Sequence, residues 1–119
     1  MVDMAYTPII QSGGDFDLRP SAQSTGKAIH AGPIICSLGV RYRSYCSNIA
    51  RTFLISPDKS VEINYKFLLQ LQEASLNILT EGSGKSTLKD VYNKIVGYIK
   101  EHRPDLQNNL PKSFGFSVR

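Results

Sequence analysis

SLGVRYRSYCSNIARTF, residues 37–53 of the 119-residue chain, carries the clearest indication of the fold. It overlaps two runs rich in apolar and β-branched residues, Pro33–Val40 and Ser44–Ile55, and the short segment Arg41–Arg43 separates the two runs. Such a pattern is typical of two antiparallel strands joined by a tight connection. We therefore predict a β-hairpin at the centre of the fold.

The segments around this hairpin predict a mixed α/β (α+β) architecture. Upstream, TPIIQSGG (residues 7–14) favours a short strand that ends in a glycine turn, and the polar segment Asp15–Lys27 favours a loop. Downstream, Val61–Thr80 and Thr87–His102 have apolar residues at helical spacing. The first of these helices has apolar residues on both sides, so we expect it to be covered nearly all round. The expected fold is an antiparallel hairpin sheet covered by two helices.

Length and charge limit the class of protein. A chain of 119 residues with 41% hydrophobic content can form one compact unit or a piece of one. Fourteen basic and ten acidic side chains give a net charge of +4, which favours contact with phosphates or acidic surfaces without requiring either. No stretch approaches the ~20 apolar residues of a membrane span, and the start MVDMAY lacks a secretory signal. We expect a soluble, intracellular chain that does not contact membranes.

A basic and aromatic patch is expected at the tip of the hairpin. It consists of Arg41, Tyr42, Arg43 and Tyr45. Residues at a hairpin tip are solvated in any case, so the patch has two interpretations: an ordinary surface, or a site that binds a partner protein or nucleic acid.

The cysteines and histidines do not form a recognisable catalytic or zinc-binding pattern. Cys36 and Cys46 are too few for a zinc site with four ligands, and a turn near Arg41 would place them opposite each other in the hairpin. We interpret them as reduced, partly buried residues, with a redox-sensitive bridge as the alternative. Neither His30 nor His102 has a carboxylate and a nucleophile at a suggestive spacing.

The segment GSGKST, residues 82–87, ends like a phosphate-binding loop, but its spacing excludes one. A P-loop needs a glycine five residues before the glycine of the GK pair, and Leu79 holds that position. We interpret the segment as a polar connection between helices. Thr87 followed by Asp90 then resembles a capping box at the start of the second helix, which Pro104 should end.

Four quoted segments together resemble a known family. They are VDMAYTPIIQSGGDFDLRPSAQS (residues 2–24), IICSLGVRYRSYCSNIARTF (34–53), FLLQLQEA (67–74) and DVYN (90–93). These segments closely resemble the aminopeptidase-like domain of the large subunits of FACT histone chaperones. That domain is a catalytically inactive relative of the creatinase, prolidase and aminopeptidase P enzymes, which have the pita-bread fold. The resemblance covers nearly the whole chain.

The resemblance implies that a metal site has lost its ligands. In the active relatives, two aspartates eleven residues apart on the hairpin hold the catalytic metals; Ser37 and Asn48 occupy these positions here. An upstream active-site histidine would fall near Arg19 and Pro20. A hydroxyl and an amide carry no negative charge to offset a divalent cation, so we expect no metal, no cofactor and no peptidase activity. The remaining ligands, a histidine and two glutamates, belong to the second half of that fold, so residues 1–119 are expected to form a single partial pita-bread domain.

The resemblance also implies a function and partners. It implies a non-enzymatic histone chaperone component, located in the nucleus and on the chromosome, that acts in nucleosome disassembly and reassembly during transcription elongation, replication and repair. The implied partners are core histones and nucleosomes and, through the full-length protein, the HMG-box subunit of the FACT complex. Sequence-specific DNA binding is not expected.

Histones are basic, so a chain of charge +4 cannot attract them through its net charge. Contacts are expected to depend on shape and apolar surface at the hairpin tip and in the Asp15–Lys27 loop. Two alternatives stay open: a divergent metallopeptidase fragment that cleaves Xaa-Pro peptides with other ligands, and a DNA-binding module. The DNA-binding alternative rests only on the pI of about 9.2 and predicts affinity that falls steeply with salt.

Overall fold

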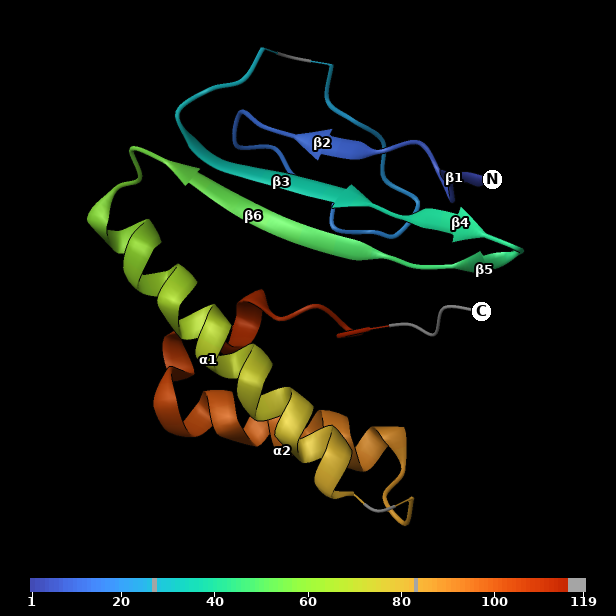
Figure 1. The fold of residues 1–119 in the computed structure, drawn as a ribbon. Helices are drawn as coiled ribbons and strands as arrows, with labels where there is room; N and C mark the ends of the chain where they lie inside the picture. Colours follow the sequence, from blue (N-terminus) through green and yellow to red (C-terminus); the bar gives the residue numbers. More distant parts are fainter. Residues whose placement is uncertain (27, 83, 116–119) are drawn as a thin grey trace. The chain divides into compact units, whose positions relative to one another are not determined.

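The computed structural model describes residues 1–26, 28–82 and 84–115 (Figure 1). The chain divides into two compact units, one formed by Met1–Glu62 and the other beginning at Ile63. The first unit contains the strands, and the second contains most of the helical residues. The mixed α and β architecture expected from the sequence is therefore confirmed.

The first unit is built from two antiparallel three-stranded sheets. The larger sheet has the order β2 (Ile9–Gln11), β3 (Gly32–Leu38) and β6 (Ile49–Ile55). The smaller sheet has the order β1 (Val2–Met4), β4 (Val40–Tyr42) and β5 (Tyr45–Cys46). β2 confirms the strand predicted within residues 7–14, whereas β1 was not predicted.

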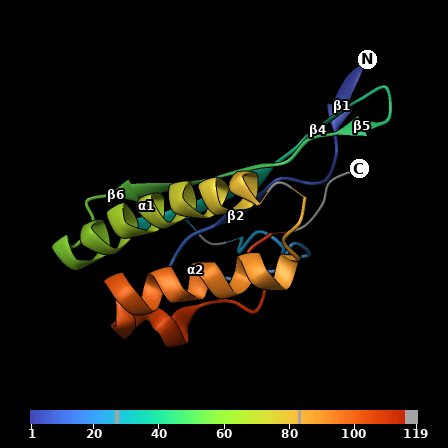
Figure 2. The same cartoon turned by 90° about the horizontal axis from the view of Figure 1, so that it is seen from below.

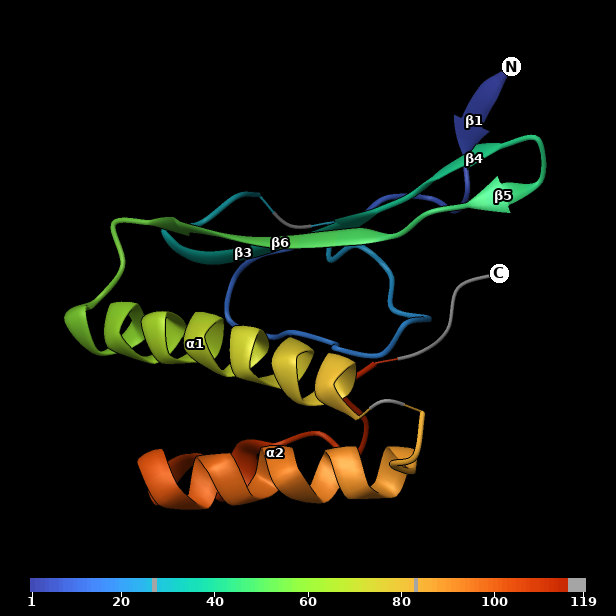
Figure 3. The ribbon, with the colours of Figure 1, turned by 60° about the horizontal axis from the view of Figure 1, so that its bottom comes forward.

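The predicted hairpin is present, and it is shared between the two sheets. Its inner part is the β3–β6 pair and its outer part is the β4–β5 pair, as Figures 1 and 3 show. The chain turns at Arg43 and Ser44, whose φ values of 47° and 68° are both positive. Two positive φ values in a two-residue loop are typical of a type I′ turn, which matches the twist of the flanking strands.

The expected position of this turn, Arg41–Arg43, was wrong. The expectation that Cys36 and Cys46 lie opposite each other in the hairpin was wrong as well. Tyr42 belongs to β4 and pairs with Tyr45. Because the turn lies further along the chain than expected, Cys36 lies opposite Arg51 and Cys46 lies opposite Arg41. Both cysteines are free thiols, and they lie in different sheets.

The second unit is a pair of helices and a short 3-10 helix, η1 (Pro104–Asn109), seen in Figure 2. α1 spans Lys59–Glu81 and α2 spans Leu88–His102, close to the predicted helices. Thr87 and Asp90 form the predicted capping box, since each side chain accepts a hydrogen bond from the backbone N–H of the other. A cluster of side chains at helical spacing joins the helices: Phe67, Leu71, Ile78, Val91, Ile95, Tyr98, Ile99 and Leu110.

The expectation that the first helix would be covered nearly all round was wrong. Leu68, Leu69, Leu76 and Leu79 of α1 are about half exposed, between 48% and 55%. Within the second unit, the stripe formed by Phe67, Leu71 and Ile78 packs in the helical core.

Candidate functional site

The two positions at which a metal site was expected to be lost meet in the structure. The Ser37 hydroxyl lies 3.4 Å from Oδ1 of Asn48, within hydrogen-bond reach. The Tyr6 hydroxyl hydrogen-bonds to both residues: it lies 2.8 Å from the Ser37 hydroxyl and donates to Oδ1 of Asn48. We call these three residues the Tyr6 cluster.

Three separate segments of the first unit position the Tyr6 cluster. Tyr6 lies between β1 and β2, Ser37 is the penultimate residue of β3, and Asn48 directly precedes β6. The ladder between β3 and β6 pairs Ser37 with Ala50, two residues beyond Asn48, so the two side chains are held near each other by register. The cluster is therefore placed by backbone pairing.

Beside the cluster, other atoms approach the backbone closely at Gly39, which lies between β3 and β4. A β-carbon on Gly39 would lie 2.1 Å from the Ser47 carbonyl oxygen and 3.0 Å from Cε1 of Tyr6. The Gly39 carbonyl also accepts a hydrogen bond of 3.0 Å from the N–H of Ala5. The absence of a side chain at Gly39 thus lets the Tyr6 ring and the opposite strand approach the backbone closely.

The chemistry of the Tyr6 cluster does not suit a divalent cation. Its polar atoms belong to a phenol, a hydroxyl and an amide, and none of these groups carries a negative charge at neutral pH. No group of three or more His, Cys, Asp and Glu side chains suited to a metal ion occurs among residues 1–26, 28–82 and 84–115. Hard cations need carboxylate oxygens, so these three residues do not fit a hard divalent cation.

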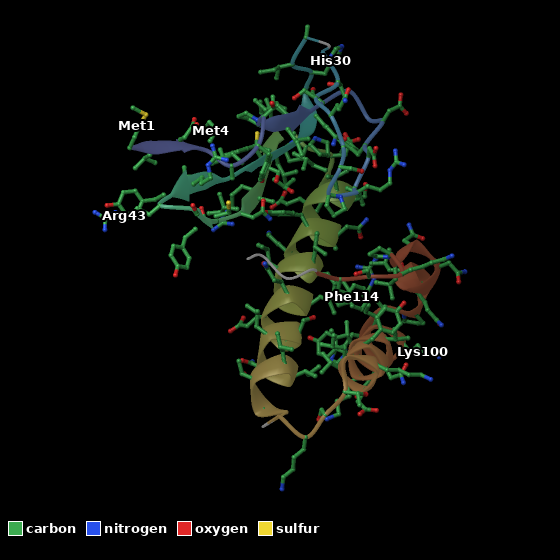
Figure 4. The ribbon with its side chains drawn as sticks, turned by 90° about the vertical axis from the view of Figure 1, so that its right-hand side faces the viewer. Met1, Met4, His30, Arg43, Lys100 and Phe114 are labelled. Atoms are coloured by element: carbon green, nitrogen blue, oxygen red, sulfur yellow. The ribbon has the colours of Figure 1, made fainter. Side chains whose placement is uncertain are left out.

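The hairpin-tip residues Arg41, Tyr42, Arg43 and Tyr45 are all exposed, and the strand pairing places Arg41 on one face of the smaller sheet and Tyr42 and Tyr45 on the other. Figure 4 labels Arg43, at the outer end of the hairpin. Directly paired residues share a face. One face therefore presents a set of apolar and aromatic side chains that we call the tip face: Val2, Met4, Val40, Tyr42 and Tyr45. These side chains are between 41% and 81% exposed, which is high for five neighbouring large apolar groups.

Charged groups lie at the outer end of the tip face and on the opposite face of the smaller sheet. The Arg43 guanidinium lies 5.3 Å from the centroid of the Tyr42 ring, a cation–π distance. On the opposite face, Arg41 forms an ion pair of 3.4 Å with Asp3, and both side chains are more than half exposed. An exposed pair of this kind contributes little to stability. The tip face therefore combines apolar surface with one cationic group at its outer end.

The loop expected at Asp15–Lys27 is held in place by β2, although Lys27 lies outside the described residues. The buried Gln11 side chain bonds to Asp17 twice: its amide N–H donates to the Asp17 carbonyl at 2.8 Å and its oxygen accepts from the Asp17 N–H at 2.7 Å. Within the loop, hydrogen bonds from the side chain and then the backbone of Arg19 lower the pKa of Asp17 to about 2. Arg19 therefore forms an ion pair with Asp17, in which its Nη2 lies 2.7 Å from the Asp17 Oδ2.

The other residues considered from the sequence are not brought into a common site. The backbone N–H of His30 donates to the Ser12 hydroxyl at 2.9 Å, and the His102 ring stacks on Tyr98 with centroids 4.0 Å apart. The segment at residues 82–87, apart from Ser83, which is not described, connects α1 to α2 and follows a helix. A P-loop follows a strand, so the interpretation of this segment as a helix connection is confirmed.

Sequence reasoning missed Tyr6 as a member of the site. It lies in a segment quoted for the family resemblance, but a single tyrosine before a short strand has no spacing that marks it as functional. The signal that identifies it is spatial, since its partners lie 31 and 42 residues further along the chain.

The chain belongs to metallopeptidase family M24, whose pattern it matches over residues 1–119. Among curated proteins it is 52% identical over 117 residues to FACT complex subunit SPT16 of Candida albicans and 48% identical over 117 residues to the same subunit of Saccharomyces cerevisiae. Each alignment covers 97% of this chain and 11% of the relative. The chain thus spans about a tenth of the length of these curated relatives.

Solved structures agree with this assignment. The N-terminal domain of SPT16 from Eremothecium gossypii matches with a TM-score of 0.87 and 43% identity, over 98% of this chain and 26% of that one. The corresponding domain from Cicer arietinum matches with a TM-score of 0.83 and 43% identity, over 98% of this chain and 28% of that one. The fold is therefore part of the pita-bread type, and the chain matches an SPT16 N-terminal domain over nearly all its length. No helix in the described part of the chain has the length and apolar character needed to cross a membrane.

Proposed function

We propose that this chain is a non-enzymatic, histone-binding part of a FACT complex subunit. In this proposal it acts in the nucleus, on the chromosome, in nucleosome disassembly and reassembly during transcription elongation, replication and repair. Its partners are core histones and nucleosomes, and the HMG-box subunit contacts the full-length protein. The observation that carries the proposal is the match, at 43% to 52% identity over nearly the whole chain, to proteins named as FACT complex subunits.

The neutral Tyr6 cluster supports the non-enzymatic part of the proposal. Ser37 and Asn48 hold the aspartate positions that the family resemblance implies, and neither can offset the charge of a metal. Residues 1–119 are proposed to form the first half of the pita-bread domain.

The tip face supports the proposal of a protein partner. Histones are basic, so Arg41 and Arg43 are not expected to attract them, whereas the exposed Tyr42 and Tyr45 offer apolar contact area. We therefore expect aromatic contacts to account for more of the histone affinity than charge does.

Thermal unfolding of the chain with and without excess core histones at physiological salt tests this function. A ligand that prefers the native state raises its apparent stability, by about 2.7 kcal/mol at a hundredfold excess over Kd. We expect histones to raise Tm, Y42S/Y45S to remove most of that rise, and R41Q/R43Q to remove less. L88S, at a side chain that is 82% exposed on α2, is the matched control. A folded Y42S/Y45S variant with an undiminished rise would contradict the tip-face assignment, and no rise in the parent chain would contradict histone binding by these residues.

Membership of family M24 favours a second candidate, a divergent metallopeptidase that uses other ligands. This candidate requires stoichiometric Mn²⁺, Co²⁺ or Zn²⁺ after equilibrium dialysis and cleavage of Xaa-Pro peptides. We expect neither. Detection of both in the same preparation would favour the enzyme over the chaperone.

A further inference from the structure

The Tyr6 hydroxyl lies between two groups that come from opposite strands of the hairpin. It is 2.8 Å from the Ser37 hydroxyl and donates to Oδ1 of Asn48, and those two groups are 3.4 Å from each other. Two oxygens bound to one tetrahedral cation at about 2.0–2.2 Å lie roughly 3.3–3.6 Å apart. The spacing at this site is therefore close to that of a metal-bridged pair, while the bridging atom is a phenol oxygen.

The proton arrangement accounts for the two contacts of the Tyr6 hydroxyl with neutral groups alone. A phenol hydroxyl has one proton and can also accept hydrogen bonds, and an amide oxygen only accepts. Tyr6 gives its proton to Asn48, so the Ser37 hydroxyl can give its own proton to the Tyr6 oxygen. The result is a directed chain from Ser37 through Tyr6 to Asn48 that needs no ion.

The Tyr6 ring is also held in place. The preceding residue, Ala5, donates its N–H to the Gly39 carbonyl at 3.0 Å, and the ring lies against the bare α-carbon of Gly39. This backbone anchor fixes the segment between β1 and β2, so the hydroxyl reaches the two strands without having to order a free loop. Tyr6 thus adds a side-chain contact between the hairpin and the segment that connects β1 to β2, two strands that already pair with β4 and β3.

From these observations we propose that the Tyr6 hydroxyl is a structural bridge that stands in place of the metal ion of this fold. It joins the segment before β2, the end of β3 and the start of β6. The proposal assigns a positioning role and is independent of histone binding, so either one can fail without the other.

A double-mutant cycle of Y6F, N48A and Y6F/N48A tests the bridge by thermal unfolding. Y6F keeps the ring and removes one oxygen, and we expect Tm to fall by about 3–6 °C. Both single variants break the same contact, so their effects should not add. The Tm of the double variant should lie within about 1 °C of the Tm of the less stable single variant. The matched control is Y45F, which removes a hydroxyl from a side chain that is 81% exposed and should leave Tm unchanged. Additive shifts, or a Y6F shift equal to that of Y45F, would overturn the proposal.

Two further readouts distinguish a bridge from general packing. N48D keeps an oxygen that accepts the Tyr6 proton, so its Tm at pH 7 should stay near that of the parent; a loss as large as that of N48A would overturn the proposal. Hydrogen exchange follows the Ser47 amide, which donates to the Val40 carbonyl at 2.9 Å beside the cluster. Y6F should speed exchange of the Ser47 amide at least tenfold and leave the exchange rate of the Val91 amide of α2 unchanged. Equal Ser47 exchange rates in Y6F and the parent chain would contradict a bridging role.

Discussion

The carbonyl oxygen of Ser47 lies against the α-carbon of Gly39, so close that a β-carbon there would be only 2.1 Å from that oxygen. Gly39 is buried and joins β3 to β4, and the obstructing atom belongs to the backbone of the opposite strand. A side chain at this position cannot be accommodated by a change of rotamer. The junction between the two sheets therefore depends on a single glycine.

G39A is expected to destabilise the chain by about 2–4 kcal/mol, because the two strands must separate to admit the methyl group. Urea denaturation followed by circular dichroism measures this change. G97A is the matched control: a β-carbon on Gly97 of α2 meets nothing within 4 Å, and alanine favours a helix over glycine by about 0.8–1 kcal/mol. G39A and G97A should thus shift the midpoint in opposite directions, and a neutral G39A would contradict the close approach at this junction.

I99A is expected to lower the free energy of unfolding by about 2–5 kcal/mol, because it leaves a cavity in the helical core. Ile99 is only 1% exposed and packs in the same cluster as Leu71 and Ile95. L88A, on the same helix at a side chain that is 82% exposed, should change stability by no more than about 0.5 kcal/mol. Equal effects of the two variants would show that the helical core is not packed as described.

The capping box of α2 gives the chain an acid-sensitive contact. Hydrogen bonds from the backbone N–H and then the hydroxyl of Thr87 lower the pKa of Asp90. Since the folded pKa lies below the unfolded value of about 3.9, the stabilisation is complete above that value and is lost as pH falls through the folded pKa. D90A should therefore melt below the parent at pH 7, and the difference should shrink below about pH 4. K89A, one residue earlier, should show no such trend, and a D90A difference that stays constant with pH would exclude the contact.

R43N/S44G should stabilise the hairpin by about 0.5–1 kcal/mol, because asparagine and glycine adopt positive φ more readily than arginine and serine do. The φ values of 47° and 68° at these positions are those of a type I′ turn. Chemical denaturation measures the gain, and the single variant S44P, which forces a negative φ, should instead destabilise the hairpin. A loss of stability in R43N/S44G would mean that the turn has another geometry.

Most of the fold could be predicted from periodicity, and the errors have identifiable causes. The helices and the capping box at Thr87 were predicted because their apolar spacing and end signals are local. The turn at Arg43 and Ser44 was misplaced because neither residue is a typical type I′ residue. β1 was missed because a strand of three residues carries too little pattern to detect.

The site was predictable only in part. Ser37 and Asn48 were identified through the family resemblance, and the ladder brings them together. Tyr6 was not identified, because its partners lie on other strands and only the folded chain places them beside it. The tip face was also missed as a surface, since its members come from β1, β4 and β5, and β1 was not expected.

The two ladders of the hairpin keep one register through the Gly39 junction: Leu38 pairs with Ile49, and further out Arg41 pairs with Cys46 without an offset. Residues added between Arg43 and Ser44 would lengthen the outer end and leave every pair below it unchanged. A single residue removed between Ser37 and the turn, or between the turn and Asn48, would instead shift this register and separate the two side chains. The outer turn is thus the part of this hairpin that can be extended, in evolution or by inserting a peptide epitope. The number of residues between the turn and the Tyr6 cluster, on either strand, has to be kept.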